Sequence, residues 1–254
     1  MSIALQIEIT TRCNFDCFYC AGRLMRQGDM SYGRFREILQ RQVVENGIPK
    51  VVSLQGEGEP TLHPDFFRMA QLVREVGSKP YTITNGTHKH PEHFFGLFAN
   101  VGVSIDTLDA AVARQVGRYN LKRVIAFVES LASHLTVVIH SVAHKDHTPS
   151  VAAWCLERGY VHVVQPLQLK ADYRRRYADR VSAPGSTGRF SCGYIAGDRL
   201  RYFTLDAQEL PCPFIKDVGL YPGLSAMRNH QKTGAWPACC IECHHAGRES
   251  SLPG

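Results

Sequence analysis

A regular alternation of short apolar segments with amphipathic ones runs through the first three quarters of this chain. Segments with the two-residue period of a strand, or with a short apolar run, alternate with segments of helical spacing. Six such units predict a parallel sheet with right-handed crossovers, and so an α/β fold. The predicted strands are Ile3–Ile9, Val51–Leu54, Tyr81–Thr84, Val101–Ile105, Leu135–Ile139 and Val161–Val164, and the predicted helices are Tyr32–Val44, Pro64–Val76, Arg123–Ser133 and Ser150–Arg158.

Polar and glycine-rich segments follow several of these predicted strands. They are the loop that carries Cys13 to Cys20, the segment Gly56 to Pro60, the pair Asn85-Gly86 and the segment Ser104 to Asp106. In a parallel sheet the carboxyl ends of the strands meet at one edge, and ligands collect there. We therefore expect these four segments to surround a single site.

Composition narrows the class of protein. A chain of 254 residues with 44% hydrophobic content fits one large domain, or one domain with a small appendage. No apolar stretch is long enough to cross a membrane, and the start MSIALQIEIT lacks a basic region and a cleavage site, so we expect a cytoplasmic protein with no membrane partner. The net charge of +6 comes from basic residues spread over the chain, which does not favour a nucleic-acid partner.

The alternation stops after Lys170, where basic residues precede Pro184-Gly185-Ser186. The basic residues are Arg174, Arg175, Arg176 and Arg180. We predict a domain boundary near residue 180, with a core at residues 1–180 and a small cysteine-rich module at residues 181–254.

The first cysteine group, Cys13, Cys17 and Cys20, has the spacing C-x3-C-x2-C. Three thiolates leave one coordination position unfilled, whereas a structural zinc site is normally closed by four protein ligands. An iron-sulfur cluster with one open iron fits this group better. The alternative is a zinc knuckle that borrows a distant histidine or cysteine.

The second cysteine group lies in the tail and has five members: Cys192, Cys212, Cys239, Cys240 and Cys243. The residues from Leu200 to Leu205 alternate in polarity, a turn follows, and Leu210 begins a return strand. This pattern predicts a hairpin that brings Cys192 and Cys212 together. We take Cys240 rather than Cys239 as the third ligand, because it begins a C-x2-C pair. On spacing alone, a zinc ribbon explains the group as well as a second iron-sulfur cluster does.

Three further features are interpreted as structural. The segment THKHPEH contains His88, His90 and His93, but Pro91 interrupts it, and we interpret it as a surface loop rather than a metal site. Cys155 lies among apolar neighbours on a predicted helix and is interpreted as a buried thiol. The run from Tyr173 to Tyr177 mixes arginine with tyrosine and is interpreted as a solvated face between domains.

Four motifs of this chain together resemble those of the radical S-adenosylmethionine (SAM) superfamily. They are CNFDCFYC at 13–20, GEGEP at 56–60, TNG at 84–86 and SID at 104–106. The resemblance covers about the first 170 residues and implies a partial (βα)6 TIM-type barrel as the core. The tail, with cysteine, hairpin, cysteine, helix and C-x2-C, resembles the twitch module, a shortened form of the SPASM domain, and adds a small cysteine-rich hairpin and helix to that fold.

The resemblance also implies cofactors and the residues that hold them. The first cysteine group would bind a 4Fe-4S cluster whose open iron is chelated by SAM, and Cys192, Cys212, Cys240 and Cys243 would bind a second 4Fe-4S cluster. Gly58 and Glu59 would meet the SAM amine, Tyr19 would lie against the adenine, and Asn85 and Ser104 would complete the SAM site, with Ser104 near the ribose or carboxylate. No catalytic acid or base is assigned; Tyr194, Asp206 and Glu242 are candidates.

The implied reaction is reductive cleavage of SAM to a 5'-deoxyadenosyl radical, which takes a hydrogen atom from the substrate. An external one-electron reductant of the flavodoxin or ferredoxin type would be a partner. The favoured substrate is a ribosomally made peptide that is crosslinked, epimerised or excised. Because residues 1–30 leave no room for a peptide-recognition domain, this function calls for a separate recognition protein. The alternatives are a small-molecule dehydrogenase resembling the aminocyclitol dehydrogenase, and a metal-stabilised binding protein without activity.

Overall fold

The structure of the protein is a computed structural model that describes residues 4–143, 148–170, 173, 177, 186, 188–197 and 200–247. Its strands are β1 (Ala4–Ile7), β2 (Val51–Leu54), β3 (Lys79–Tyr81), β4 (Ile83–Thr84), β5 (Asn100–Ser104), β6 (Thr136–Ala143), β7 (Val161–Pro166), β8 (Leu200–Phe203) and β9 (Glu209–Leu210). Its α-helices are α1 (Tyr32–Asn46), α2 (Phe66–Glu75), α3 (Ala110–Val116), α4 (Leu121–Ala132), α5 (Thr148–Arg158), α7 (Gly193–Gly197) and α8 (Leu224–Thr233).

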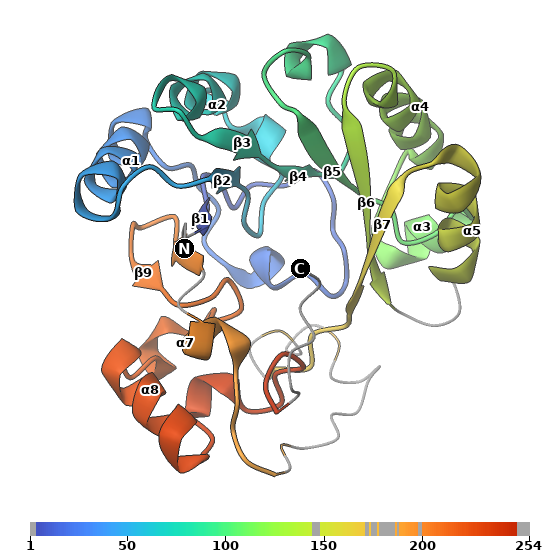
Figure 1. Cartoon of the computed structure of the whole chain (residues 1–254). Helices are drawn as coiled ribbons and strands as arrows, with labels where there is room; N and C mark the ends of the chain where they lie inside the picture. The colour runs from blue at the N-terminus through green and yellow to red at the C-terminus, as the bar shows by residue number, and fades with distance from the viewer. Residues whose placement is uncertain are drawn as a thin grey trace.

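The strands form two sheets, with the orders β3-β2-β1-β8-β9 and β4-β5-β6-β7. All neighbouring strands are parallel except β8 and β9. The sheets meet at Thr82, whose carbonyl accepts from Gly102 N and whose hydroxyl donates to Leu54 O, both at 2.9 Å. Helices α1, α2, α4 and α5 lie outside the curved wall of strands, so the predicted α/β fold with a partial barrel is confirmed (Figure 1).

Two local features differ from the sequence prediction. The strand predicted at Tyr81–Thr84 is divided into β3 and β4, which belong to different sheets, because Thr82 bonds to both neighbours there. Helix α3 was not predicted, although Asp109 caps its start by accepting from Ala111 N and Val112 N. A helix of seven residues is too short for its apolar period to be recognised.

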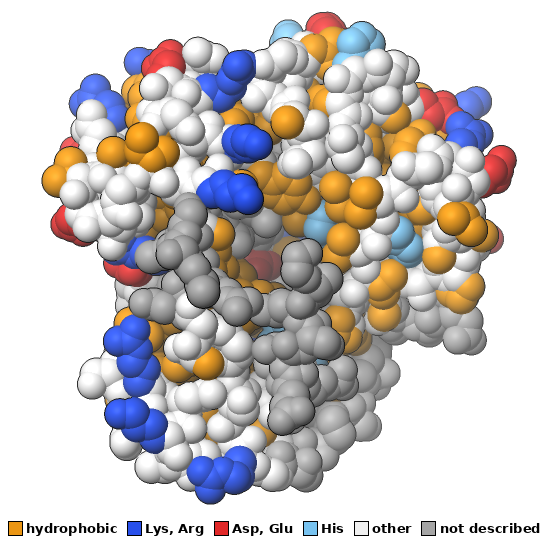
Figure 2. Space-filling view, viewed as in Figure 1, with side chains coloured by type: hydrophobic (Ala, Val, Ile, Leu, Met, Phe, Trp, Pro, Cys, Tyr) orange, Lys and Arg blue, Asp and Glu red, His pale blue; other side chains and the backbone are white. Residues whose placement is uncertain are grey.

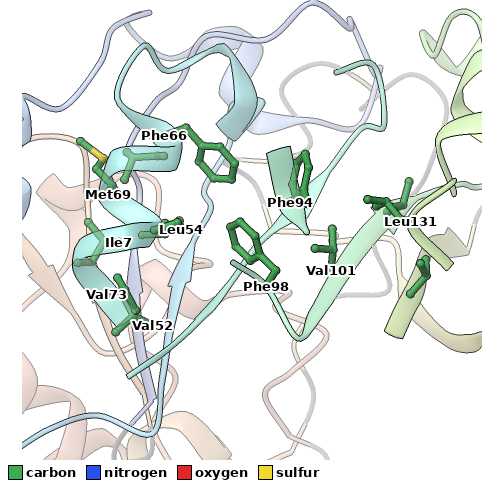
Figure 3. Close-up of a cluster of buried hydrophobic side chains, with 14 of the residues drawn as sticks. Ile7, Val52, Leu54, Phe66, Met69, Val73, Phe94, Phe98, Val101 and Leu131 are labelled. Atoms are coloured by element: carbon green, nitrogen blue, oxygen red, sulfur yellow. The ribbon is translucent and has the colours of Figure 1, made fainter. Parts of the chain in front are cut away.

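The main core fills the space between the strands and the helices that cover them. In the part drawn in Figure 3, Met69 and Val73 of α2 lie close to Val52 and Leu54 of β2. All four side chains are fully buried. Burial of such a side chain contributes about 1.5–3 kcal/mol, so this contact holds α2 on the wall and fixes where β2 ends. Cys155 of α5 belongs to the same core, which confirms the prediction of a buried thiol there.

The C-terminal segment packs as a second, smaller core against the open side of the wall, as Figure 1 shows for α7 and α8. The predicted hairpin is present as β8 and β9, and β8 also pairs with β1 of the first sheet. Tyr173 and Tyr177 are buried against the loop of the first cysteine group rather than solvated. The arginines between them, and the predicted boundary near residue 180, lie outside the described residues. No described helix is long and apolar enough to span a membrane.

Candidate functional site

The first cysteine group lies on the loop between β1 and the short helix η1 (Ala21–Leu24). Cys17 is buried, Cys13 and Cys20 are partly exposed, and none of the three forms a disulfide bond. Phe15 N donates to Cys13 Sγ at 3.4 Å. The loop therefore presents all three sulfur atoms at the carboxyl end of β1, where the sequence analysis placed them.

The end of helix α3 holds this loop in place. Asp16 N donates to Gly117 O and Phe18 N donates to Val116 O, each at 3.0 Å. Gly117 has a φ of 92°, and a Cβ atom on it would lie 2.1 Å from Asp16 O. A glycine is therefore required where α3 meets the cysteine loop.

A cavity of about 420 Å³ opens beside the three sulfur atoms. It is lined by Cys13, Cys17 and Cys20 together with the predicted SAM-binding residues Tyr19, Gly58, Glu59, Asn85 and Ser104. Other polar residues complete the wall: Gln6, Gln55, Glu57, Tyr81, Arg118, His140, Gln165, Tyr173, Tyr194 and Lys216. The volume is in the range of small-molecule sites. The structure thus brings the predicted first-site residues together; their ligand roles remain predictions.

Gly58 and Glu59 join the loop after β2 to the cysteine loop. A Cβ atom on Gly58 would lie 2.4 Å from Thr10 O, so only glycine permits this approach of two backbones. Glu59 is buried, and its Oε1 accepts from the hydroxyls of Thr61 and Thr84 at 2.7 and 2.6 Å. Burial raises the pKa of Glu59, and these hydrogen bonds oppose the rise. Glu59 therefore links the segments that follow β2 and β4 through hydrogen bonds.

Asn85 and Ser104 follow β4 and end β5. Asn85 N donates to Glu59 Oε2 at 2.6 Å, and Asn85 Nδ2 lies 2.7 Å from Asn14 Oδ1 and 3.9 Å from Cys13 Sγ. Ser104 O accepts from Arg118 at 3.2 Å. Asn85 is thereby placed in contact with the cysteine loop, and Ser104 lies on the neighbouring strand β5, which pairs with β4.

Tyr19 takes part in a buried charged network with Asp106 and Arg118. Its hydroxyl donates to Asp106 and accepts from Arg118 Nη2 at 2.8 Å, while Arg118 Nε donates to Asp106 Oδ2 at 2.6 Å. Burial raises the pKa of Tyr19 well above its usual value, so the phenol stays protonated. Arg118 was missed by the sequence analysis because α3, which leads to it, was not recognised.

A second buried ion pair, also missed, joins the C-terminal segment to the cavity. Lys216 Nζ lies 2.8 Å from Glu57 Oε1, which also accepts from the Tyr173 hydroxyl at 3.0 Å. Burial alone would raise the pKa of Glu57, but Lys216 and Tyr173 outweigh it and lower this pKa. Glu57 lies within the GEGEP motif, but no pattern in the sequence points to Lys216 as its partner.

Tyr81 and His140 form a neutral polar pair in the cavity wall. The Tyr81 hydroxyl and His140 Nε2 are 2.9 Å apart. Burial, and then the neighbouring His162, lower the pKa of His140 to about 4, and burial raises the pKa of Tyr81 to about 12. At neutral pH both groups are uncharged and can exchange hydrogen bonds with a polar ligand.

The environment of the first three thiols suits metal ligation. Burial raises the pKa of Cys13 and Cys17, and burial together with Glu57 raises that of Cys20 to about 12. Arg118 lowers the pKa of Cys13 and Cys17, but burial dominates. Such thiols ionise at neutral pH only when a cation binds them, so the donor set fits an iron-sulfur cluster.

The five cysteines of the second group are all buried in the C-terminal core. Cys239 Sγ lies 3.7 Å from the sulfur of Met227 on α8, and Cys243 Sγ accepts from Gln168 Nε2 at 3.7 Å. Burial raises the pKa of Cys212 to about 12 and that of Cys243 as well, while Lys170 acts in the opposite direction. The predicted ligands thus come together around a site with a buried cation beside it.

The three acid-base candidates near the second group differ in position. Tyr194 lines the cavity, and burial raises its pKa to about 12. Asp206 lies on the surface and pairs with Arg26 at 2.8 Å. Glu242 does not line the cavity; its backbone N donates to Ser186 Oγ at 2.6 Å. Of the three, Tyr194 alone is a cavity residue.

Comparison with known proteins identifies a family and several relatives that this chain resembles. Residues 7–152 match the profile of the family described as "Radical SAM superfamily". The "S-adenosylmethionine-dependent nucleotide dehydratase" of Selenomonas ruminantium is 27% identical over 147 residues, which are 56% of this chain and 53% of the relative. The chain spans about half the length of the curated relatives it matches.

Two solved structures share the fold. Streptococcus suis SuiB bound to precursor peptide SuiA has a TM-score of 0.68 and 17% identity, over 88% of this chain and 62% of that chain. BtrN in complex with AdoMet and 2-DOIA has a TM-score of 0.51 and 14% identity, over 98% of this chain and 94% of that chain. At these identities the likeness shows the fold alone.

Proposed function

The chain belongs to the radical SAM superfamily, and from that premise we propose that this enzyme abstracts a hydrogen atom from a ribosomally made peptide and so modifies it. When bound, the cluster supplies one electron that breaks the C5'–S bond of SAM, releasing methionine and the 5'-deoxyadenosyl radical that takes the hydrogen. The products of the proposed step are 5'-deoxyadenosine and a substrate radical.

One observation carries the SAM-cleaving part of this proposal. The three thiols of the first group share one cavity with Tyr19, Gly58, Glu59, Asn85 and Ser104. In the proposed site the thiolates hold the cluster and Gly58 exposes backbone to the SAM amine beside the charge of Glu59. Tyr19 faces the adenine, while Asn85 and Ser104 position the rest of SAM.

We propose that the second cysteine group holds an auxiliary 4Fe-4S cluster through Cys192, Cys212, Cys240 and Cys243. What supports this is that all five cysteines of the group are buried together in the C-terminal core. Cys239 Sγ lies 3.7 Å from the Met227 sulfur and 3.8 Å from Cys240 Sγ, and we take Cys240 as the third ligand because it begins the C-x2-C pair.

The proposed reaction requires partners. An external one-electron reductant of the flavodoxin or ferredoxin type would deliver the electron to the first cluster. The peptide would be presented by a separate recognition protein. SuiB, which has a similar fold, has been solved bound to precursor peptide SuiA, and this supports a peptide substrate for the chain.

The second candidate function is oxidation of a small polar metabolite by the same radical step. The observation that favours it is the neutral pair of Tyr81 and His140 in the wall of the cavity that Gln55 also lines, since these groups suit the hydroxyls of a small molecule. Under this function the auxiliary cluster would accept an electron after hydrogen abstraction.

The first experiment measures iron, sulfide and electron paramagnetic resonance on anaerobically reconstituted protein, together with 5'-deoxyadenosine formed from SAM under dithionite. We expect about eight irons per chain, falling to about four in Cys13→Ala/Cys17→Ala/Cys20→Ala with loss of 5'-deoxyadenosine. The double variant Cys240→Ser/Cys243→Ser should lose the other four irons. Cys155→Ala, a matched control, should lose no iron.

The outcome separates the proposals. No 5'-deoxyadenosine from protein that holds about four or more irons would contradict radical SAM activity here. About four irons that vanish in the triple variant, with zinc in the remainder, would refute the auxiliary cluster. Deuterium transfer into 5'-deoxyadenosine from labelled precursor peptides, set against labelled polyols, then decides between the two substrate classes.

A further inference from the structure

Three histidines and a glutamate gather on the segment between β4 and β5. They are His88, His90, Glu92 and His93, and the sequence analysis interpreted this segment as a surface loop. Pale-blue histidine and red acidic side chains meet at the upper edge of Figure 2, where that segment lies in Figure 1. The cluster is outside the cavity and shares no residue with either cysteine group.

Their potential ligand atoms are already close together. One atom each from His90, Glu92 and His93 lies within 4.8 Å of the other two, and His90 Nδ1 is 3.0 Å from Glu92 Oε1. His88 Nε2 is 3.3 Å from His93 Nδ1. Two imidazole nitrogens on a tetrahedral ion, with bonds of about 2.0–2.1 Å, would be separated by about 3.3 Å. The histidine spacing therefore matches that of two ligands on one ion.

The segment beneath the cluster is packed into the main core and against α2. Phe94, which follows His93, is fully buried in the main core. The ring of Phe67 on α2 lies 5.2 Å from the rings of both His88 and His93. Pro91 starts the short helix η3 (Pro91–Phe94), which turns His90 and His93 to the same side, with stacked rings 5.0 Å apart. The proline that argued against a metal site in the sequence analysis thus helps to align the ligands.

The donor set selects the kind of ion. Three imidazoles and one carboxylate suit zinc, cobalt, nickel or copper, whereas magnesium and calcium prefer oxygen ligands.

We propose that His88, His90, Glu92 and His93 form a surface site for a divalent transition-metal ion. The ion would hold His88 and the short helix η3 together within one segment, which packs on Phe67 of α2. Because this segment follows Asn85, which bonds to Asn14 in the cysteine loop, the ion would steady one wall of the cavity from outside. The site does not depend on the proposed radical chemistry.

The test is a titration of cobalt(II) chloride into anaerobic holoenzyme whose iron-sulfur sites are already filled. We expect about one cobalt per chain with visible d-d bands and no thiolate-to-cobalt charge-transfer band, because the ligands are nitrogen and oxygen. His90→Ala and His93→Ala should each weaken binding by more than about tenfold. Lys89→Ala in the same segment and His230→Ala on α8 are controls that should bind cobalt as the wild type does.

Three results would overturn the site: no cobalt bound beyond the iron-sulfur content, a strong thiolate charge-transfer band, or unchanged affinity in both histidine variants. Circular dichroism and iron content of each variant guard against misfolding. A variant that keeps its iron and its helix signal but loses cobalt binding supports the site.

Discussion

A neutral histidine in the cavity wall links the stability of this protein to pH. His140 has a pKa of about 4 in the folded chain, because it is buried and then because His162 lies near it. In the unfolded chain an imidazole has its usual pKa of about 6.5. As the pH falls from about 6.5 toward 4, the unfolded state takes up a proton that the folded state does not, so stability decreases in that window.

We predict that His140→Gln makes the thermal midpoint less sensitive to acid. Wild type should lose more stability than the variant between pH 7.5 and 5.5, because glutamine has no proton to take up. The measurement is the melting midpoint by circular dichroism at both pH values, with His230→Gln as the control for loss of a histidine outside the cavity. Equal acid sensitivity in wild type and His140→Gln would count against a depressed pKa.

At the scale of elements, close approach of loops decides where the site residues lie. The loop after β2 can pass the loop after β1 only because Gly58 has no side chain, since a Cβ atom there would meet Thr10 O at 2.4 Å and Arg12 O at 2.7 Å. Both obstacles are backbone atoms, which cannot move aside as a flexible side chain can. Residue 58 therefore controls the position of the cysteine loop relative to β2.

We predict that Gly58→Ala disrupts the first metal site more than the rest of the fold. Iron content should fall by about four per chain, because the displaced cysteine loop no longer presents its three thiols together. Gly33→Ala is the matched control: it lies on α1 with nothing within 4 Å, and alanine should stabilise the helix by up to about 1 kcal/mol. Full iron content in Gly58→Ala would show that the loops can separate without cost.

Most elements of the core were predictable because their signals are local. Val51–Leu54 is a strand with the predicted bounds, and the predicted helix at 150–158 is α5, two residues longer at its start. The divided strand around Thr82 was not predictable, since hydrogen bonds to Leu54 and Gly102, which are distant in sequence, interrupt it. The motif segments at the ends of β2, β4 and β5 were found for the same local reason.

At the scale of the whole molecule, the C-terminal segment is joined to the first sheet rather than appended to it. Strand β8 pairs with β1 from Ala4↔Leu200 to Ile7↔Phe203. The Lys216–Glu57 ion pair adds a charged contact whose two side chains are 6% and 14% exposed. Removing one partner of a buried pair costs about 3–5 kcal/mol, because it leaves the other charge buried and uncompensated.

We predict that Lys216→Met lowers the thermal midpoint of the whole chain in one transition. Glu57→Gln/Lys216→Met should recover most of the loss, because no buried charge is left unpaired in the double variant. These two variants and Glu57→Gln alone are measured by scanning calorimetry on holoenzyme, with Lys232→Met on α8 as a control for loss of a lysine. A double variant as unstable as the sum of the single variants would show that the two side chains are not coupled.

The amino-acid sequence by itself determined the strand-helix alternation, the two cysteine groups and the motif segments at the strand ends. Each of these features depends on residues that are close together in the sequence, because strand period, helix period and ligand spacing are local properties. Only the tertiary structure decided that Lys216 meets Glu57, that Arg118 joins Tyr19 and Asp106, and that β8 lies beside β1. These contacts join residues far apart along the chain, and packing of the whole molecule, rather than any local pattern, brings them together.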